Sequence, residues 1–219
     1  MHRAIAITAV FLGGFAVMVL EIIGARYLGK DFGGSFYVWI SQIGVILVAL
    51  SAGYYLGGAL ADRFQRAAFL GWLLVPTALF VCLIPDFAGQ VLDWIVMRHP
   101  MDRPIPAIWQ KLDPALGSGL IFLLPCLVLA MLSPYMIRLA AGNLAQVGRV
   151  SGLIYAASTV GSIAGVFISG YILIDHMALS QIFRVTGGLI LVLALLCLAM
   201  DRWWRETPGS MASGKVMHT

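Results

Sequence analysis

Glu21 is the residue of this sequence best placed to do chemistry, because it is a carboxylate within a long apolar run that begins near residue 4. A charged side chain in bilayer hydrocarbon costs about 3 kcal/mol or more, unless it is paired, hydrated or protonated. Arg26 follows five residues later and could neutralise the carboxylate. Two interpretations remain open: Glu21 binds a ligand or a proton, or it forms a structural ion pair with Arg26.

Further polar side chains lie within apolar runs and would prefer the interior of a helical bundle. Together with Glu21 and Arg26 they could outline a small pocket that faces the outer half of the membrane and suits a cationic or zwitterionic ligand. Hydrogen bonds between helices account for the same residues more readily. The residues are Gln42, Tyr54, Tyr55, Tyr155, Ser158 and Thr159.

The motifs of soluble enzymes are missing from the sequence. It contains no glycine-rich phosphate loop, no paired Cys-x-x-Cys and no His-Glu-x-x-His, and its four histidines are dispersed. We therefore expect no metal, no cofactor and no catalysis by this chain alone. The basic residues are scattered singly, which argues against nucleic acid as a partner.

The composition indicates which elements must hold these side chains. Hydrophobic residues make up 61% and charged residues 11% of the 219 residues, against about 45–50% and 25% in soluble domains. This predicts an all-α, polytopic membrane bundle in the lipid bilayer, because helices satisfy their own backbone hydrogen bonds in lipid. Six spans are expected, at residues 4–28, 36–61, 67–85, 115–141, 150–174 and 180–201.

The distribution of Lys and Arg predicts the orientation of this domain, residues 1–201. Short loops on the side of the termini carry more basic residues, so we expect both termini in the cytoplasm. The long loop 86–114 is expected outside, with an interfacial helix at its start. Residues 202–219 are expected to form a polar cytoplasmic tail.

Small residues recur every four positions in the second and fifth predicted spans. Gly53 and Gly57 in one, and Gly161 and Gly165 in the other, would let neighbouring helices approach closely. Asp62 and Asp175 end these two spans on opposite membrane faces, as two inverted three-helix repeats would place them. A simpler role for Asp62 is to cap the N-terminus of the third helix.

Two stretches resemble known families. Gly58, Asp62, Arg63 and Arg66 are similar to the cytoplasmic loop 2–3 motif of major facilitator transporters, with Gln65 in place of its last glycine. More of the chain resembles the membrane region of bacterial fused major-facilitator/spermidine-synthase-like proteins. That resemblance lies in residues 19–26, 32–39, 51–58 and 152–165, although the family tends to have Asn where Ser158 stands.

The resemblance implies a six-helix membrane domain that works with a cytoplasmic aminopropyltransferase-like domain or protein. The chain lacks the glycine-rich and acidic motifs of that domain, so no catalytic residue carries over. Our leading hypothesis is therefore a membrane partner or anchor of a separately encoded spermidine-synthase-like protein. A second hypothesis is a half-transporter that acts as a homodimer, with Glu21 as coupling carboxylate. A third is a structural subunit of a larger membrane complex.

Overall fold

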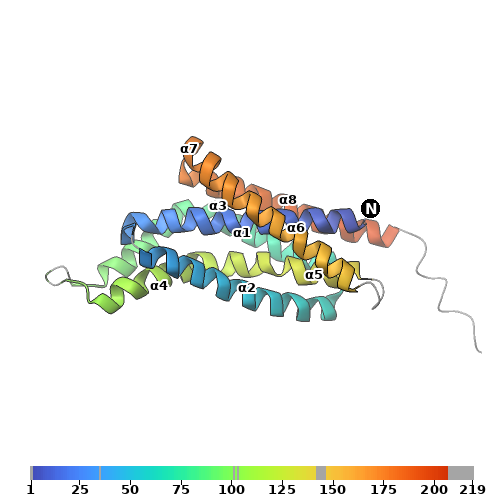
Figure 1. Ribbon diagram of the computed structural model, residues 1–219, viewed down its shortest axis with the longest axis horizontal. Coiled ribbons are helices and arrows are strands. Elements are labelled where there is room, and N and C mark those ends of the chain that lie inside the picture. Colours follow the sequence, from blue (N-terminus) through green and yellow to red (C-terminus); the bar gives the residue numbers. More distant parts are fainter. Residues whose placement is uncertain (1, 35, 101, 103, 142–146, 207–219) are drawn as a thin grey trace, which may run out of the picture.

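Helices are the regular secondary structure of this chain over the residues that the computed structural model describes, which are 2–34, 36–100, 102, 104–141 and 147–206, and short turns connect them. Six of the helical stretches are long and apolar enough to cross a bilayer. The predicted all-α bundle of six spans is therefore confirmed. The first span begins and the last span ends at one end of the bundle, which we call the N-terminal end; the opposite end is the hairpin end (Figure 1).

The spans lie where the sequence predicts them but extend further. A helix rises about 1.5 Å per residue, so spans of about 30 residues exceed the roughly 30 Å hydrocarbon core and project into the interface. The elements are α1 (His2–Phe32), α2 (Phe36–Phe64), α3 (Ala67–Met97), α4 (Ala107–Ala130), α5 (Leu132–Ala140), α6 (Val147–Ile168), the π-helix η2 (Ser169–Leu173), α7 (Ile174–His176) and α8 (Leu179–Glu206).

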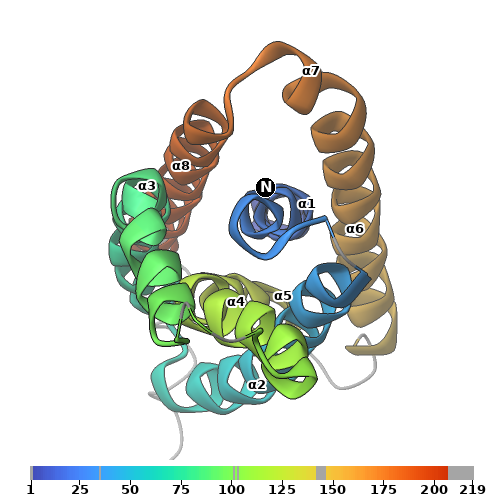
Figure 2. The same ribbon diagram turned by 90° about the vertical axis from the view of Figure 1, so that its left-hand side faces the viewer.

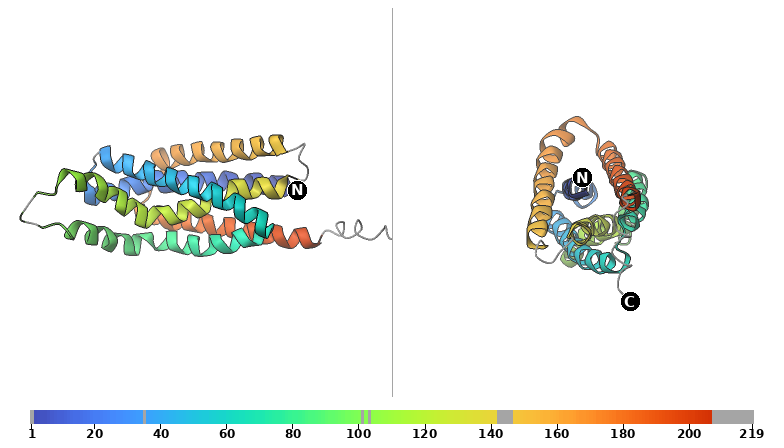
Figure 3. Two further views of the ribbon diagram at one scale, coloured as in Figure 1. Left: turned by 90° about the horizontal axis from the view of Figure 1, so that it is seen from below. Right: turned by 90° about the vertical axis from the view of Figure 1, so that its right-hand side faces the viewer.

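The expected interfacial helix in the loop 86–114 is not a separate element. Residues 86–97 continue α3 without a break, and Pro85 lies inside that helix. Proline is tolerated there because its missing N–H removes one hydrogen bond and leaves the rest of the helix intact. Helix α4 then begins at Ala107, so that Pro114, expected in an extended segment, is helical as well. The two helix ends form a hairpin beyond the other spans (Figure 3).

The fourth span is interrupted where the sequence predicts one helix. Helices α4 and α5 meet at Met131, whose N–H lies 3.3 Å from the carbonyl oxygen of Leu127 and 3.2 Å from that of Val128. Pro134 lies in the first turn of α5, where a helix does not need its N–H. Helix α8 continues to Glu206, so the first five residues of the predicted polar tail, 202–206, are helical; the remainder of the tail, 207–219, lies outside the described residues.

Helix α1 is the central element of the bundle, and the other spans surround it (Figure 2). The main packing pairs are α1 with α6, α2 with α4 and α5, and α3 with α8. In terms of the six spans, the first packs on the fifth, the second on the fourth and the third on the sixth. The same pairs result when the first, second and third spans change places with the fourth, fifth and sixth, which run in the opposite direction across the bundle. The packing is thus that of two inverted three-helix repeats.

The two glycine stripes are used inside the bundle. A Cβ added at Gly57 would lie 2.7 Å from the Met131 Cα, and one at Gly165 would lie 2.6 Å from the Phe15 carbonyl oxygen. Gly53 likewise lies against the backbone of α4, and Gly161 against the backbone of α1. These glycines therefore hold α2 on the fourth span and α6 on α1.

Helices α2 and α6 are the least covered of the spans. Only 22% of the most apolar stretch of α2 and 17% of that of the span containing α6 is buried, against 44–61% in the other four. They flank α1 and α5 and are not one of the main packing pairs, and a pocket lined by both helices lies between them, in what we call the groove.

Candidate functional site

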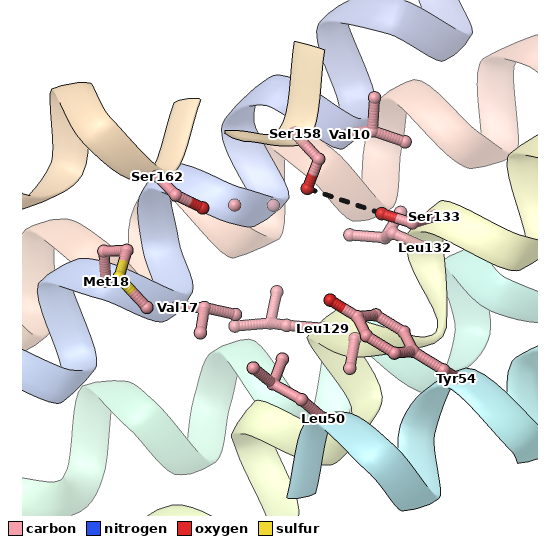
Figure 4. A pocket seen from close by; sticks show the side chains of 13 residues that line it. Val10, Val17, Met18, Leu50, Tyr54, Leu129, Leu132, Ser133, Ser158 and Ser162 are labelled. Carbon is pink, nitrogen blue, oxygen red and sulfur yellow. Dashed lines mark hydrogen bonds between the residues drawn. The ribbon is translucent and has the colours of Figure 1, made fainter. Parts of the chain in front are cut away.

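A small pocket lies in the groove between α2 and α6, and it is the best candidate for a functional site. It has a volume of about 50 Å³ and is partly open to the surroundings of the bundle. Its polar lining consists of hydroxyl groups, from Tyr54 on α2, Ser133 on α5, and Ser158 and Ser162 on α6. The remaining wall is apolar and comes mainly from α1 and the fourth span (Figure 4).

The hydroxyl groups of the pocket differ in whether they have a hydrogen-bond partner. The Ser133 hydroxyl donates to the Ser158 Oγ at 3.4 Å, which ties α5 to α6. The Tyr54 hydroxyl points into the space (Figure 4) and has no hydrogen-bond partner among the described residues. A pocket of this size has room for more than one water molecule, because a single water needs about 10–15 Å³. The pocket therefore offers polar groups and space to a small polar solute.

The pocket lies close to the middle of the spans. Its lining comes from the middle of α1, α2 and α6 and from the junction of α4 and α5. Gly13 and Gly14 lie in the half of α1 that precedes Glu21, so the pocket is displaced from the centre toward the N-terminal end.

Glu21 lies beside this pocket and not within its lining. It is half-buried, three and four residues beyond Met18 and Val17, two lining residues of α1. Residues at these spacings share a helix face, so the carboxylate stands one turn from the pocket, toward the hairpin end. The expected ion pair with Arg26 does not form: Arg26 is exposed, and Glu21 has no ion pair or hydrogen bond with any described residue. The structural-pair interpretation of Glu21 is therefore wrong in this conformation.

Gln42 is fully buried and takes part in packing, not in the pocket. Its Oε1 accepts a hydrogen bond from the Ser118 hydroxyl at 2.6 Å, and its Nε2 donates to the Leu20 carbonyl oxygen at 3.4 Å. Gly24 leaves the space next to this amide free of a side chain. The amide thus joins α1, α2 and α4 on the hairpin side of Glu21.

Removing one partner of this network should destabilise the bundle modestly. We expect Ser118→Ala to lower the free energy of unfolding by about 1 kcal/mol, because the buried Gln42 oxygen loses its donor. The double change Gln42→Leu with Ser118→Ala should cost less than the sum of the single changes. Unfolding by SDS in mixed micelles measures both values. A Ser118→Ala protein as stable as wild type would show that the hydrogen bond contributes nothing.

The other predicted pocket residues lie outside it. Tyr55 is 78% exposed and points away from the bundle, and Tyr155 is 49% exposed on the groove side of α6. The Thr159 hydroxyl donates to the Tyr155 carbonyl oxygen of its own helix at 2.8 Å. The pocket therefore includes Tyr54 and Ser158 of the predicted set. Sequence reasoning missed Ser133 and Ser162, although Ser162 follows Ser158 by one helical turn.

The predicted loop motif holds the N-terminal end of the bundle together. The Arg138 Nε donates to the Asp62 Oδ1 at 2.6 Å, and the Tyr135 hydroxyl donates to the Arg66 carbonyl oxygen at 2.8 Å. Arg63 lies over the Phe64 ring, 5.5 Å from its centroid. Asp62 does not cap α3, whose N-cap position is Arg66 without a side-chain hydrogen bond. The fourth residue of the motif, Gly58, has open space around it.

A buried ionic cluster at the hairpin end was not foreseen. Asp113 forms an ion pair with Arg98, and its Oδ2 lies 2.7 Å from the His99 Nε2. The Arg98 guanidinium also lies over the Trp109 ring, 4.3 Å from its centroid. The Asp113 side chain is only 5% exposed. The cluster fastens the end of α3 to the start of α4; its residues lie in the segment 86–114, which the sequence predicts to be a loop.

No group of three or more His, Cys, Asp or Glu side chains in the described part of the chain is arranged to hold a metal ion. No protein-family model matches the sequence, and comparisons with curated proteins and with solved structures find no significant similarity. The chain is thus a multi-pass helical membrane protein with a hydroxyl-lined groove beside a half-buried carboxylate.

Proposed function

We propose that this chain moves a small cationic or zwitterionic molecule across the membrane, as one half of a homodimeric transporter. The observation that supports this best is the hydroxyl-lined pocket at the middle of the spans, open between α2 and α6. Polar groups at this depth are costly in lipid and are typical of solute or ion pathways. A protein that served only as an anchor would not need the carboxylate of Glu21 beside these hydroxyl groups.

Charge decides the class of solute. The described lining of the pocket contains no Lys or Arg, and the nearest ionisable group on its wall of α1 is Glu21. A carboxylate and hydroxyl oxygens favour a cation such as an ammonium group, which the Tyr54 ring can also attract. The pocket is too small for more than the charged end of such a molecule, so the rest of the ligand requires space outside one copy.

Transport in reconstituted vesicles tests this function. We expect uptake of a labelled monoamine, polyamine or amino acid by wild-type protein, and at least a tenfold loss in Glu21→Gln, because a neutral amide lacks the charge that holds the cation. Tyr54→Phe should lower uptake, whereas Tyr55→Phe, on the outer surface of the same helix, should not. Absence of uptake for every solute class, or equal uptake by both Tyr→Phe variants, would contradict the proposal.

The resemblance to fused major-facilitator/spermidine-synthase-like proteins supports a second candidate function. We propose it as an alternative in which the bundle is the membrane partner of a separately encoded aminopropyltransferase-like protein. Its resembling segments, residues 19–26, 32–39, 51–58 and 152–165, lie in α1, α2 and α6 and at the ends of α1 and α2. Affinity purification in detergent that recovers no such protein, with unchanged polyamine levels in a deletion strain, would exclude this alternative.

We also propose that both termini face the cytoplasm of a bacterial inner membrane. In support, α1 begins and α8 ends at the same end of the bundle, and the helix ends there carry Arg63, Arg66, Arg138 and Arg149. Fusion of a reporter enzyme to the C-terminus tests this orientation; a reporter active only outside the cell would contradict it.

A further inference from the structure

The groove-side faces of α2 and α6 differ in composition from the other exposed surfaces of the bundle. Ser51, Tyr54 and Gly58 share one face of α2, and Gly44 lies two turns from Ser51 on the same face. On α6, Tyr155, Thr159 and Ser162 share a face with two glycines, Gly148 and Gly152. The face of α6 is thus small and hydroxylated, whereas that of α2 also carries Leu47, which is 59% exposed; both faces border the pocket.

The residues that turn away from this groove on the same helices are large and apolar. Leu153, Val160 and Phe167 on α6 are 49%, 56% and 54% exposed, as expected of a surface in contact with lipid tails. Val48 on α2 is 59% exposed. On α6 the lipid-facing surface is therefore distinct from the groove-side surface.

The groove-side glycines have no role inside the bundle. A Cβ added at Gly44, Gly58, Gly148 or Gly152 would meet no atom within 4 Å, whereas one added at Gly161 would meet the backbone of α1. Small residues of this kind let another helix approach closely in a membrane, although Gly119 on α4 and Gly188 on α8 also lie in open space. The Tyr155 hydroxyl, like that of Tyr54, has no hydrogen-bond partner among the described residues. Lipid tails would offer it none.

The two faces complement each other when a second copy is turned about an axis along the membrane normal. Such a rotation sets α2 of one copy antiparallel to α6 of the other, with equal depths opposed. Ser51 is thirteen residues from the end of α2, and Thr159 is twelve residues from the start of α6. Asp62 and Arg149 each lie two residues from these same helix ends, so Arg149 of one copy lies at the level of Asp62 of the other, whose carboxylate binds Arg138 of its own copy but is still 67% exposed.

We propose that a second copy of this chain packs on the groove-side faces of α2 and α6, so that the two pockets face each other and enclose one shared site. The inference rests on the proposed function for what the site holds, while the surface itself follows from packing and charge. It also explains why one copy offers room only for the charged end of a ligand.

Cysteine cross-linking of the full-length protein in native membranes tests this surface. In a chain whose three cysteines are replaced by alanine, Ser51→Cys with Thr159→Cys should give mainly disulfide-linked dimer after mild oxidation. The matched control, Ser51→Cys with Val160→Cys, moves one cysteine to the lipid side at the same depth and should give about fivefold less dimer, because a disulfide needs Cβ atoms about 4 Å apart. Native mass spectrometry from nanodiscs should report two copies.

Equal cross-linking of the two cysteine pairs, or a monomer in nanodiscs, would overturn the interface. These outcomes differ from a failure of the transport proposal. Cross-linking at the predicted pair without uptake of any solute would leave the surface standing and remove the proposed function. Uptake that depends on Glu21, in a protein that does not form this cross-link, would support the proposed function and exclude the proposed dimer surface.

Discussion

Asp113→Ala is expected to lower the free energy of unfolding by about 3 kcal/mol, one of the two largest single-residue effects in this protein. The substitution leaves the Arg98 guanidinium, with only 29% of its side chain exposed, without its carboxylate, and it removes the acceptor of the His99 imidazole. The ends of α3 and α4 should then separate. Unfolding in SDS micelles measures the loss, and faster cleavage of residues 98–113 by protease would locate it.

The exposed pair at the same end of the bundle serves as the control for Asp113→Ala. Arg184 lies 3.3 Å from Asp86, and both side chains are more than half exposed. Asp86→Ala should therefore change stability by less than about 1 kcal/mol. Similar losses for the two substitutions would show that burial of Asp113 contributes no extra stability to the hairpin end.

Gly161→Leu is expected to prevent correct packing of α6 on α1. Even a single Cβ at this position would overlap the main-chain carbonyl group of Phe11, and a backbone cannot rotate aside as a side chain does. Overpacking of this kind costs about 1–3 kcal/mol for small additions and more when a backbone must move. We expect loss of the monodisperse peak in size-exclusion chromatography and a much lower yield of folded protein.

Gly119→Leu provides the matched control in a helix of the same bundle. A side chain at Gly119 on α4 would meet open space, and the position lies on neither α2 nor α6. Replacing glycine there should be neutral or slightly stabilising, because glycine is a weak helix former. A Gly161→Leu protein that elutes and unfolds like Gly119→Leu would contradict the close approach of α6 to α1.

The spans could be predicted from the sequence because hydrophobic runs of this length have few alternatives to a helix in lipid. The ends of the spans could not be predicted, because neither Phe87 nor Pro85 indicates whether a helix ends at the membrane interface or continues through it. Residues 86–97 continue because Leu92 and Ile95 are buried against the bundle. That contact depends on α1 and α4, and no local pattern reveals it.

The site was only partly predictable for a similar reason. Glu21 stands out by its charge, and Tyr54 and Ser158 by their polarity within apolar runs. That Gln42 reaches Ser118 depends on how α2 and α4 are rotated toward each other, which composition does not set. Glu21 and Arg26 both lie on α1, and five residues turn a helix by about 140° beyond a full turn, so the two side chains leave it in different directions. Glycine spacing correctly identified the close contacts of Gly53, Gly57, Gly161 and Gly165, because only close approach explains small residues repeated on one face.

The central claim is that the groove between α2 and α6 is a site for polar solutes at mid-membrane depth. Reaction of single cysteines with a charged, water-soluble thiol reagent in native membranes tests it most directly. Ser162→Cys, in the pocket lining, should react quickly, while Val160→Cys, at nearly the same depth on the lipid side, should stay unmodified. Equal, slow reaction of both cysteines would show that the groove excludes water and would contradict this account.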